Sequence, residues 1–166
     1  MPVFNETIVA EFQFAHWAAV KNLEGMTHDD SIVRPHGGGN DFNWVLGHLV
    51  AVRNALIQSL GGEALNDPRL TIYVRESSDD TSRRIPLDEL RAAFAESHER
   101  LVSAIGLAGD ETLSRKAPFS PGNDPNETVG TLLRKSVVHE SYHIGQLGLL
   151  RHTAGKEGAI RMPKRP

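Results

Sequence analysis

The sequence contains no cysteine. Disulfide bonds, thiolate nucleophiles and cysteine-type zinc sites are therefore excluded, and any bound metal ion must be held by histidine, aspartate or glutamate. The chain also lacks an apolar run of the roughly 18 to 20 residues needed to span a bilayer, and its first residues lack the basic-then-apolar order of a secretory signal. These absences predict a cytoplasmic protein with no membrane partner.

A surplus of positive charge is missing as well. The chain has 18 basic and 21 acidic residues, and its net charge is −3. Binding to the phosphate backbone of a nucleic acid depends on clustered lysine and arginine, so we expect no nucleic-acid partner. What the chain does have is 39% apolar residues over 166 positions, which predicts one globular domain covering residues 1–166. It also has eight histidines.

Four segments repeat their apolar residues with the period of an α-helix, which predicts an all-α fold. The expected helices cover 6–23, the stretch from Asn40 or Asp41 to the Gly61-Gly62 pair, the stretch from Pro86 to Gly106 or Gly109, and 127–154. A capping side chain opens the second helix and a proline the third, and glycines follow their ends. Only LTIYVR at 70–75 alternates like a short strand.

Two connections are long for a compact domain. Residues 61–85, between the second and third predicted helices, are too many for a tight turn and imply a crossover, and residues 116–127 are rich in proline. Long connections of this kind either cover a functional site or run exposed over the surface. The basic residues 161–166 at the C-terminus are expected to be frayed.

The fourth predicted helix carries a pair of candidate metal ligands. His139 and His143 are four residues apart, so their side chains project from one face with β-carbons about 6 Å apart. Two imidazoles one turn apart can bind one divalent ion and need a third ligand from elsewhere. His48 is the strongest candidate, because it lies on the inward side of the second helix beside Gly47, whose missing side chain permits a close approach.

Other polar residues leave two interpretations open. Gln146 either donates to a metal-bound water or a substrate, or packs within the helix. His16 and His98 fall beside the buried stripes of the first and third helices, where they either orient a metal ligand or pack with a hydrogen bond to a neighbour. The remaining loop and helix-end histidines are expected to be exposed: His28, His36 and His152.

The segment HESYH at 139–143 matches the H-E-x-x-H pattern of zincin peptidases. In those enzymes the glutamate, here Glu140, acts as general base. Glu140 lies about 100° around the helix from His139, so a salt bridge is the alternative. The longer metzincin form would need glycine and histidine where Gln146 and Leu149 stand. A zincin-like peptidase is therefore kept only as a second alternative.

The order of WVLGHL in the second helix and TVGTLLRKSVVHESYHIGQLGLLRHTAG in the fourth resembles the DinB/YfiT-like superfamily of bacterial four-helix bundles. The most specific parts are W-x-x-G-H and H-x-x-x-H-x-G-Q, the latter running into LLR, and the resemblance covers nearly the full chain. It implies an up-down-down-up bundle with a long crossover between helices two and three. It also implies a divalent metal held by His48, His139 and His143, and a homodimer.

The same resemblance suggests a reaction type. Relatives include bacillithiol S-transferases and the mycothiol-dependent maleylpyruvate isomerase, although the mycothiol branch has a glutamate where this chain has His139. Three neutral ligands leave the full charge on the ion and an open position. We therefore expect one divalent transition metal per chain, zinc or nickel ahead of iron or manganese. It would serve a thiol S-transferase or hydrolase acting on a small molecule, such as a low-molecular-weight thiol. The alternative is a non-catalytic, metal-stabilised binding or dimerisation module.

Overall fold

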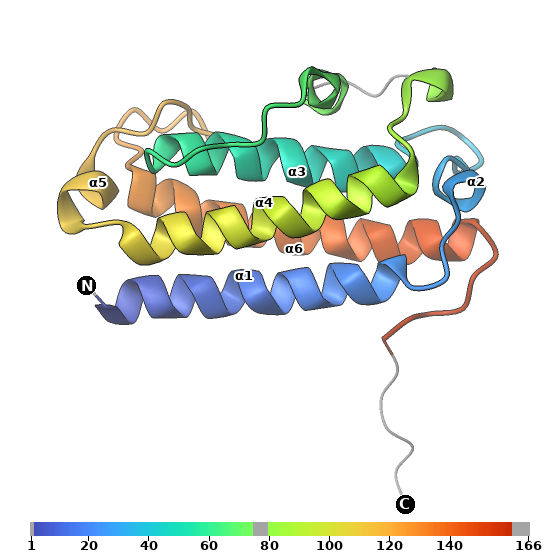
Figure 1. Ribbon diagram of the computed structural model, residues 1–166, viewed down its shortest axis with the longest axis horizontal. Helices are drawn as coiled ribbons and strands as arrows, with labels where there is room; N and C mark the ends of the chain where they lie inside the picture. Colours follow the sequence, from blue (N-terminus) through green and yellow to red (C-terminus); the bar gives the residue numbers. More distant parts are fainter. Residues whose placement is uncertain (1, 75–79, 161–166) are drawn as a thin grey trace, which may run out of the picture.

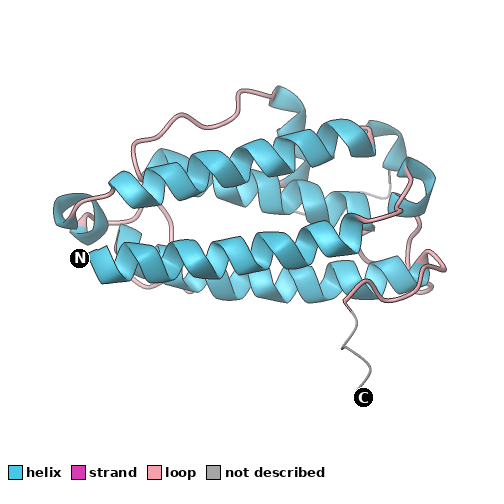
Figure 2. Cartoon of the chain, turned by 60° about the horizontal axis from the view of Figure 1, so that its bottom comes forward, coloured by secondary structure: helices cyan, strands magenta, loops and turns pink. Residues whose placement is uncertain are grey.

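The computed structural model describes residues 2–74 and 80–160. Four long helices dominate it: α1 (Pro2–Leu23), α3 (Phe42–Ser59), α4 (Leu87–Leu107) and α6 (Val129–Thr153). The connections contain two short α-helices, α2 (His28–Ser31) and α5 (Asp110–Ser114), and two 3-10 helices, η1 (Pro68–Tyr73) and η2 (Thr81–Arg83). The described ranges contain helices and loops but no strand (Figure 2), so the predicted all-α class is confirmed. The predicted frayed tail at 161–166 lies outside the described residues.

The four long helices form a bundle with an unusual order of directions. Helices α1 and α6 run one way, and α3 and α4 run the other way (Figure 1). Helix α3 packs against α4 and α6, and α1 packs against the same two helices. Because the successive helices α3 and α4 are parallel, the chain between them must return along the bundle. The up-down-down-up order and the long crossover are therefore confirmed.

The helix boundaries follow local capping. Of the two candidates for the start of α3, the cap is Asp41, whose carboxylate accepts a hydrogen bond from the Trp44 amide at 2.7 Å. Asp41 is also buried and paired with Arg84 at 2.9 Å, which fixes the end of the crossover to this helix. Helix α6 begins after the cap Thr128, slightly later than predicted. Helix α1 begins at Pro2, earlier than its predicted start at residue 6.

The segment 70–75, which alternates like a short strand in the sequence, contributes to the 3-10 helix η1 (Pro68–Tyr73), in agreement with the predicted all-α fold; Arg75 lies outside the described residues. Leu70 and Tyr73, three residues apart, are both buried. In a 3-10 helix this spacing places both side chains on one side, whereas a strand would direct them to opposite faces. The alternating apolar residues of LTIYVR are therefore not all buried, since Val74 is exposed.

The crossover is held against α3 at Tyr73. A Cβ atom added to Gly47 would lie 2.5 Å from the Tyr73 ring, so the close approach expected at this glycine is made by an aromatic side chain. The Tyr73 hydroxyl donates to Asn43 Oδ1 at 2.8 Å and accepts from the Ile85 amide at 2.9 Å. Tyr73 and Asn43 are both buried, so their hydrogen bond fixes the position of η1 over α3.

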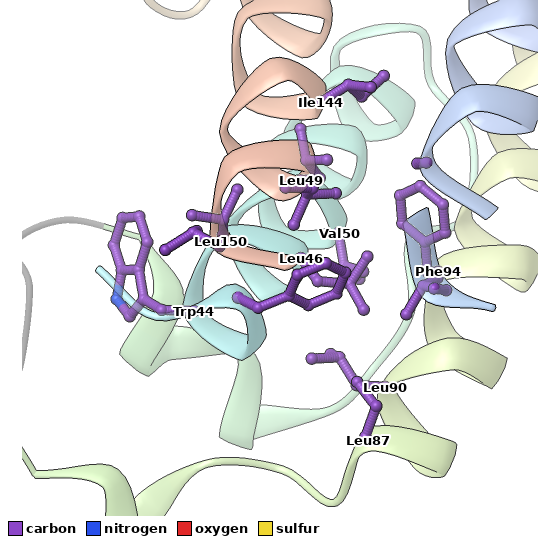
Figure 3. Close-up of a cluster of buried hydrophobic side chains, with 14 of the residues drawn as sticks. Trp44, Leu46, Leu49, Val50, Leu87, Leu90, Phe94, Ile144 and Leu150 are labelled. Carbon is purple, nitrogen blue, oxygen red and sulfur yellow. The ribbon is translucent and has the colours of Figure 1, made fainter. Parts of the chain in front are cut away.

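The apolar stripes predicted for the long helices form the core. In α1 the apolar residues that recur at helical spacing are all buried: Ile8, Phe12, Ala15, Ala19 and Leu23. Figure 3 shows side chains of α3, α4 and α6 meeting in the part of the core that lies toward α2; it labels Trp44, Leu46, Leu49, Val50, Leu87, Leu90, Phe94, Ile144 and Leu150. Among the described helices, none combines the length and apolar character of a membrane span.

Candidate metal centre

Three histidines from two helices converge at one point between α3 and α6. Helix α3 provides His48, and α6 provides His139 and His143 from successive turns. The Nε2 atom of His139 lies 3.3 Å from Nε2 of His48 and 3.1 Å from Nε2 of His143. One nitrogen from each ring lies within 4.8 Å of the other two. The structure thus brings together the three histidines that the sequence singled out as metal ligands.

Two of the three rings are oriented through their other nitrogen. His48 Nδ1 donates to the backbone carbonyl of Tyr73 at 2.8 Å, and His143 Nδ1 donates to Gln146 Oε1 at 2.7 Å. The Gln146 amide group in turn donates to the Tyr142 hydroxyl at 3.1 Å. A backbone carbonyl can only accept, so a neutral His48 carries its proton on Nδ1 and a lone pair on Nε2. Gln146 thus orients the His143 ring, and its hydrogen bond to a metal-bound water or a substrate stays a prediction.

The donor set fits a bound cation. Nε2 of His48 and Nε2 of His143 each lie within hydrogen-bond distance of His139 Nε2. His139 Nε2 carries at most one proton, so it can donate to only one of these two nitrogens, and its contact with the other has no hydrogen bond. Within the described residues, His139 Nδ1 is buried without a hydrogen-bond partner. Three bonds of about 2.1 Å meeting at about 100° would separate the nitrogens by about 3.2 Å, close to the two separations at His139, while the third pair lies within 4.8 Å. His48, His139 and His143 could therefore hold one metal ion.

Burial keeps the three rings neutral, the form in which imidazole binds metal. Desolvation lowers the pKa of His139 to about 4, and the neighbouring His143 and His48 add to this effect. Desolvation is also the main cause of the lowered pKa values of His48 and His143. Trp44 stacks on His48 with ring centroids 5.0 Å apart and so shields one face of that ring. These rings are therefore ready to bind an ion at neutral pH.

Glu140 follows His139 in sequence but faces another partner. It is 3% exposed and forms an ion pair with Arg53, whose Nε donates to Glu140 Oε2 at 3.2 Å. Arg53 is fully buried, donates to the Phe94 carbonyl at 3.0 Å and lies 4.0 Å over the Phe94 ring. Of the two roles considered for Glu140, the structure shows the interhelix salt bridge. The zincin arrangement, with a free glutamate beside the metal and a sheet before the helix, is absent from the described residues.

A cavity of about 250 Å³ opens beside His48. Its floor is the outer face of α3, and its walls include Val74 from the crossover and Phe119 from the loop at 116–127. Both long connections that the sequence suggested as covers therefore reach the site. The cavity lining is apolar apart from His48, so a small molecule entering it would find its polar contact at that histidine.

A second histidine cluster lies between α1 and α4. His16 and His98 stack in parallel, with ring centroids 4.0 Å apart and an interplanar angle of 6°, and His16 also stacks on Phe94. Within the described chain the Nδ1 atoms of both are buried without a hydrogen-bond partner. Burial, with a smaller contribution from Arg53, lowers the pKa of His16 to about 4; burial, then the charges of His16 and Arg53, lowers that of His98 to about 3. These two histidines therefore neither orient a metal ligand nor donate to a carbonyl through Nδ1.

The loop and helix-end histidines divide between two environments. His36 and His152 are exposed, as predicted. His28 is half-buried and its Nδ1 atom is buried, so the expectation of exposure is wrong for this residue. It begins the single-turn helix α2, which packs against α3, α4 and α6. The sequence contains no periodic pattern there from which this packing could have been predicted.

Sequence reasoning missed two residues that shape the site. Tyr73 acts through its backbone carbonyl, an atom that every residue possesses and that leaves no trace in the sequence. Arg53 could have been identified from the sequence, because it is a lone charge within the apolar run of α3 and such a charge requires a buried partner. Its partner Glu140 lies 87 positions further along the chain.

Comparisons with known proteins identify the family of the chain. A comparison with curated proteins finds no match. A comparison with protein families matches residues 12–147 to the DinB superfamily, a span that covers most of the chain and contains His48, His139 and His143. The four-helix order, the crossover and the shared family pattern lead to one conclusion: the chain belongs to the DinB superfamily.

Proposed function

We propose that this protein is a divalent-metal-dependent enzyme of the thiol S-transferase or hydrolase type that acts on a small molecule. The observation that carries the proposal is the convergence of three neutral Nε2 atoms, from His48, His139 and His143, beside an apolar cavity. A divalent ion held there supplies a Lewis acid, which lowers the pKa of a coordinated water or thiol. The chain itself orients the ligand rings and surrounds the substrate with apolar side chains.

The shape of the site favours an enzyme over a purely structural metal module. A structural zinc site is closed by four protein ligands, whereas a catalytic site keeps a position open. Within the described residues, the cluster at His48 consists of three side chains of metal-binding type, and the cavity begins at the same histidine. An open position adjoining a cavity is what a substrate needs.

Metal loading and thiol addition test the proposal. Elemental analysis of purified protein should find about one zinc, nickel, iron or manganese ion per chain, and His48→Ala should lose it, because a two-histidine site binds far more weakly. Bacillithiol, mycothiol, glutathione and coenzyme A are then added to the cobalt-substituted protein. The transferase proposal expects at least one thiol to change the cobalt spectrum and raise the melting temperature.

Two results would contradict the proposal in different ways. Full metal retention by His48→Ala would remove the assigned ligand set. A tightly bound ion that responds to no thiol and supports no ester or amide hydrolysis would leave the non-catalytic module. An intact casein substrate after long incubation is expected in either case, because Glu140 is paired with Arg53 and is not free to act as the general base of a peptidase.

A homodimer is also proposed. The outer surfaces of α1 and α6, which lie side by side, expose large apolar side chains: Phe14, Trp17, Val138, Tyr142 and Leu149. Apolar residues gathered on neighbouring helices are typical of subunit interfaces. Analytical ultracentrifugation should give a dimer for the native chain and a monomer for Trp17→Glu. A native chain that stays monomeric at high concentration would contradict this proposal.

A further inference from the structure

Two neighbouring cavities lie along α3. The cavity at His48 and a second one of about 400 Å³ share two lining residues, Ala55 and Phe119. The second cavity is lined further along by Gln58, Ser59, Arg115, Lys116 and Pro118. We call the combined space, from His48 to Lys116, the α3 trough. It begins at His48, one of the three histidines of the candidate metal centre, and follows the helix toward its C-terminal end.

The middle of the trough is suited to an apolar chain. Ala51 and Ala55 occupy successive turns of α3 there, and their small side chains leave room above the helix. Val74 and Phe119 stand on its walls with 53% and 41% of their surface exposed, so apolar area is available for contact. With a rise of about 1.5 Å per residue, the path from His48 to the end of the trough is about 16 Å long.

The far end of the trough is cationic. Arg115 Nη2 donates to the carbonyl of Ser59 at 2.6 Å, which holds the guanidinium at the last turn of α3. Lys116 follows Arg115 in the chain. Backbone hydrogen bonds fix this part of the loop to the start of α6, and in one of them the Val129 amide donates to the Arg115 carbonyl at 2.9 Å. Neither cavity has an acidic side chain among its described lining residues. The cations are thus placed on an ordered segment with no competing carboxylate in the lining.

These observations lead to a substrate class. We propose that the substrate is an elongated small molecule with an anionic group, a carboxylate or phosphate, joined through an apolar segment to the group that reaches the metal. Arg115 and Lys116 bind the anionic group, and Ala51, Ala55 and Phe119 contact the apolar segment. The inference rests on the proposed function, because it takes the histidine cluster as the reacting end.

Mercaptocarboxylates of different length test the proposal on the cobalt-substituted protein, where coordination of the thiolate gives a charge-transfer band. Mercaptoundecanoate spans the trough, and mercaptopropionate occupies the metal end alone. We expect the long acid to bind at least about tenfold more tightly than mercaptoundecanol, which lacks the charge. The double variant Arg115→Gln/Lys116→Gln should remove this difference. The matched variant Arg134→Gln, on the exposed face of α6, should keep it.

A second variant separates the trough from the metal. Ala55→Leu places a larger side chain where the two cavities meet, so it should weaken the long acid and leave mercaptopropionate unaffected. Long and short acids of equal affinity, or a charge preference that survives the double variant, would overturn the proposal.

Failure of the proposed function gives a different result. If neither thiol produces a cobalt band, thiol chemistry at the metal is contradicted, while the trough is still tested by calorimetry with decanoate and decanol, which need no bond to the ion. Preference for decanoate that depends on Arg115 and Lys116 supports the anionic subsite. Equal binding of the two, or no binding of either, overturns it.

Discussion

The bundle contains two buried histidine clusters that are built differently. In the triad of His48, His139 and His143, the Nε2 atoms meet at one point, and two rings are held by hydrogen bonds at Nδ1. In the stack of His16 and His98, the rings lie in parallel and the Nδ1 atoms have no partner among the described residues. Burial lowers the pKa in both clusters. Convergence and orientation, and not burial or proximity, therefore distinguish a candidate metal site from histidine packing.

Arg53 lies between the two clusters and belongs to neither. Its ion pair with Glu140 reaches the helix of the triad, and its charge contributes to the low pKa values of His16 and His98. A fully buried guanidinium is stable only because Glu140 and the Phe94 carbonyl satisfy it. This residue therefore offers a way to disturb both clusters from one point.

Removing one histidine from each cluster should give the largest contrast. His139→Ala takes away the nitrogen that lies next to both other ligands, so the chain should lose its divalent ion. His98→Ala disturbs only the stack and should retain about one ion per chain. Elemental analysis after gel filtration checks both variants. Equal metal content in the two would show that the triad is not the metal site.

Breaking the buried ion pair should have the next largest effect. Glu140→Leu leaves Arg53 as an uncompensated buried charge and should lower the free energy of unfolding by about 3–5 kcal/mol. The double variant Arg53→Met/Glu140→Leu removes both charges and should recover most of that loss. Urea unfolding of the metal-free proteins measures this. A single variant as stable as the double would mean that Arg53 finds another partner.

Acid should destabilise the protein through the stack. The pKa values of His16 and His98 are about 4 and about 3 in the folded chain and about 6.5 when unfolded, so below pH 6.5 the unfolded state binds more protons. The free energy of unfolding should therefore fall from about pH 6.5 down to about pH 4 for His16 and about pH 3 for His98, by up to about 1.4 kcal/mol per pH unit for each histidine. His98→Gln should reduce this slope in urea titrations of metal-free protein. An unchanged slope would contradict the assigned cause.

The orienting contact at Gln146 should have the smallest effect. Gln146→Leu removes the acceptor for His143 Nδ1, and loss of such a contact typically weakens metal binding about 10- to 100-fold. Gln13→Leu, an exposed glutamine on α1, serves as the control and should bind normally. Competition with a chelator of known affinity measures both. If Gln146→Leu binds as tightly as the native chain, its hydrogen bond does not orient the ligand.

Much of the fold and the histidine triad could be predicted because helical spacing carries that information. His139 and His143 must share a face if their segment is helical, and the inward position of His48 follows from the same rule. The contacts that support the triad could not be predicted in this way. The His48 partner is a main-chain atom of η1, in a segment whose alternation suggested a strand, and the Arg53–Glu140 pair depends on how two distant helices meet.

The Tyr73 carbonyl is a backbone atom, so the orientation of His48 depends on where the backbone of η1 lies and not on a particular side chain. Replacing the Tyr73 ring would leave the oxygen that faces His48, whereas a single methyl group added at Gly47 would collide with the ring and push the whole segment outward. A substitution at Gly47, which touches none of the three histidines itself, is thus expected to change the position of the His48 ring.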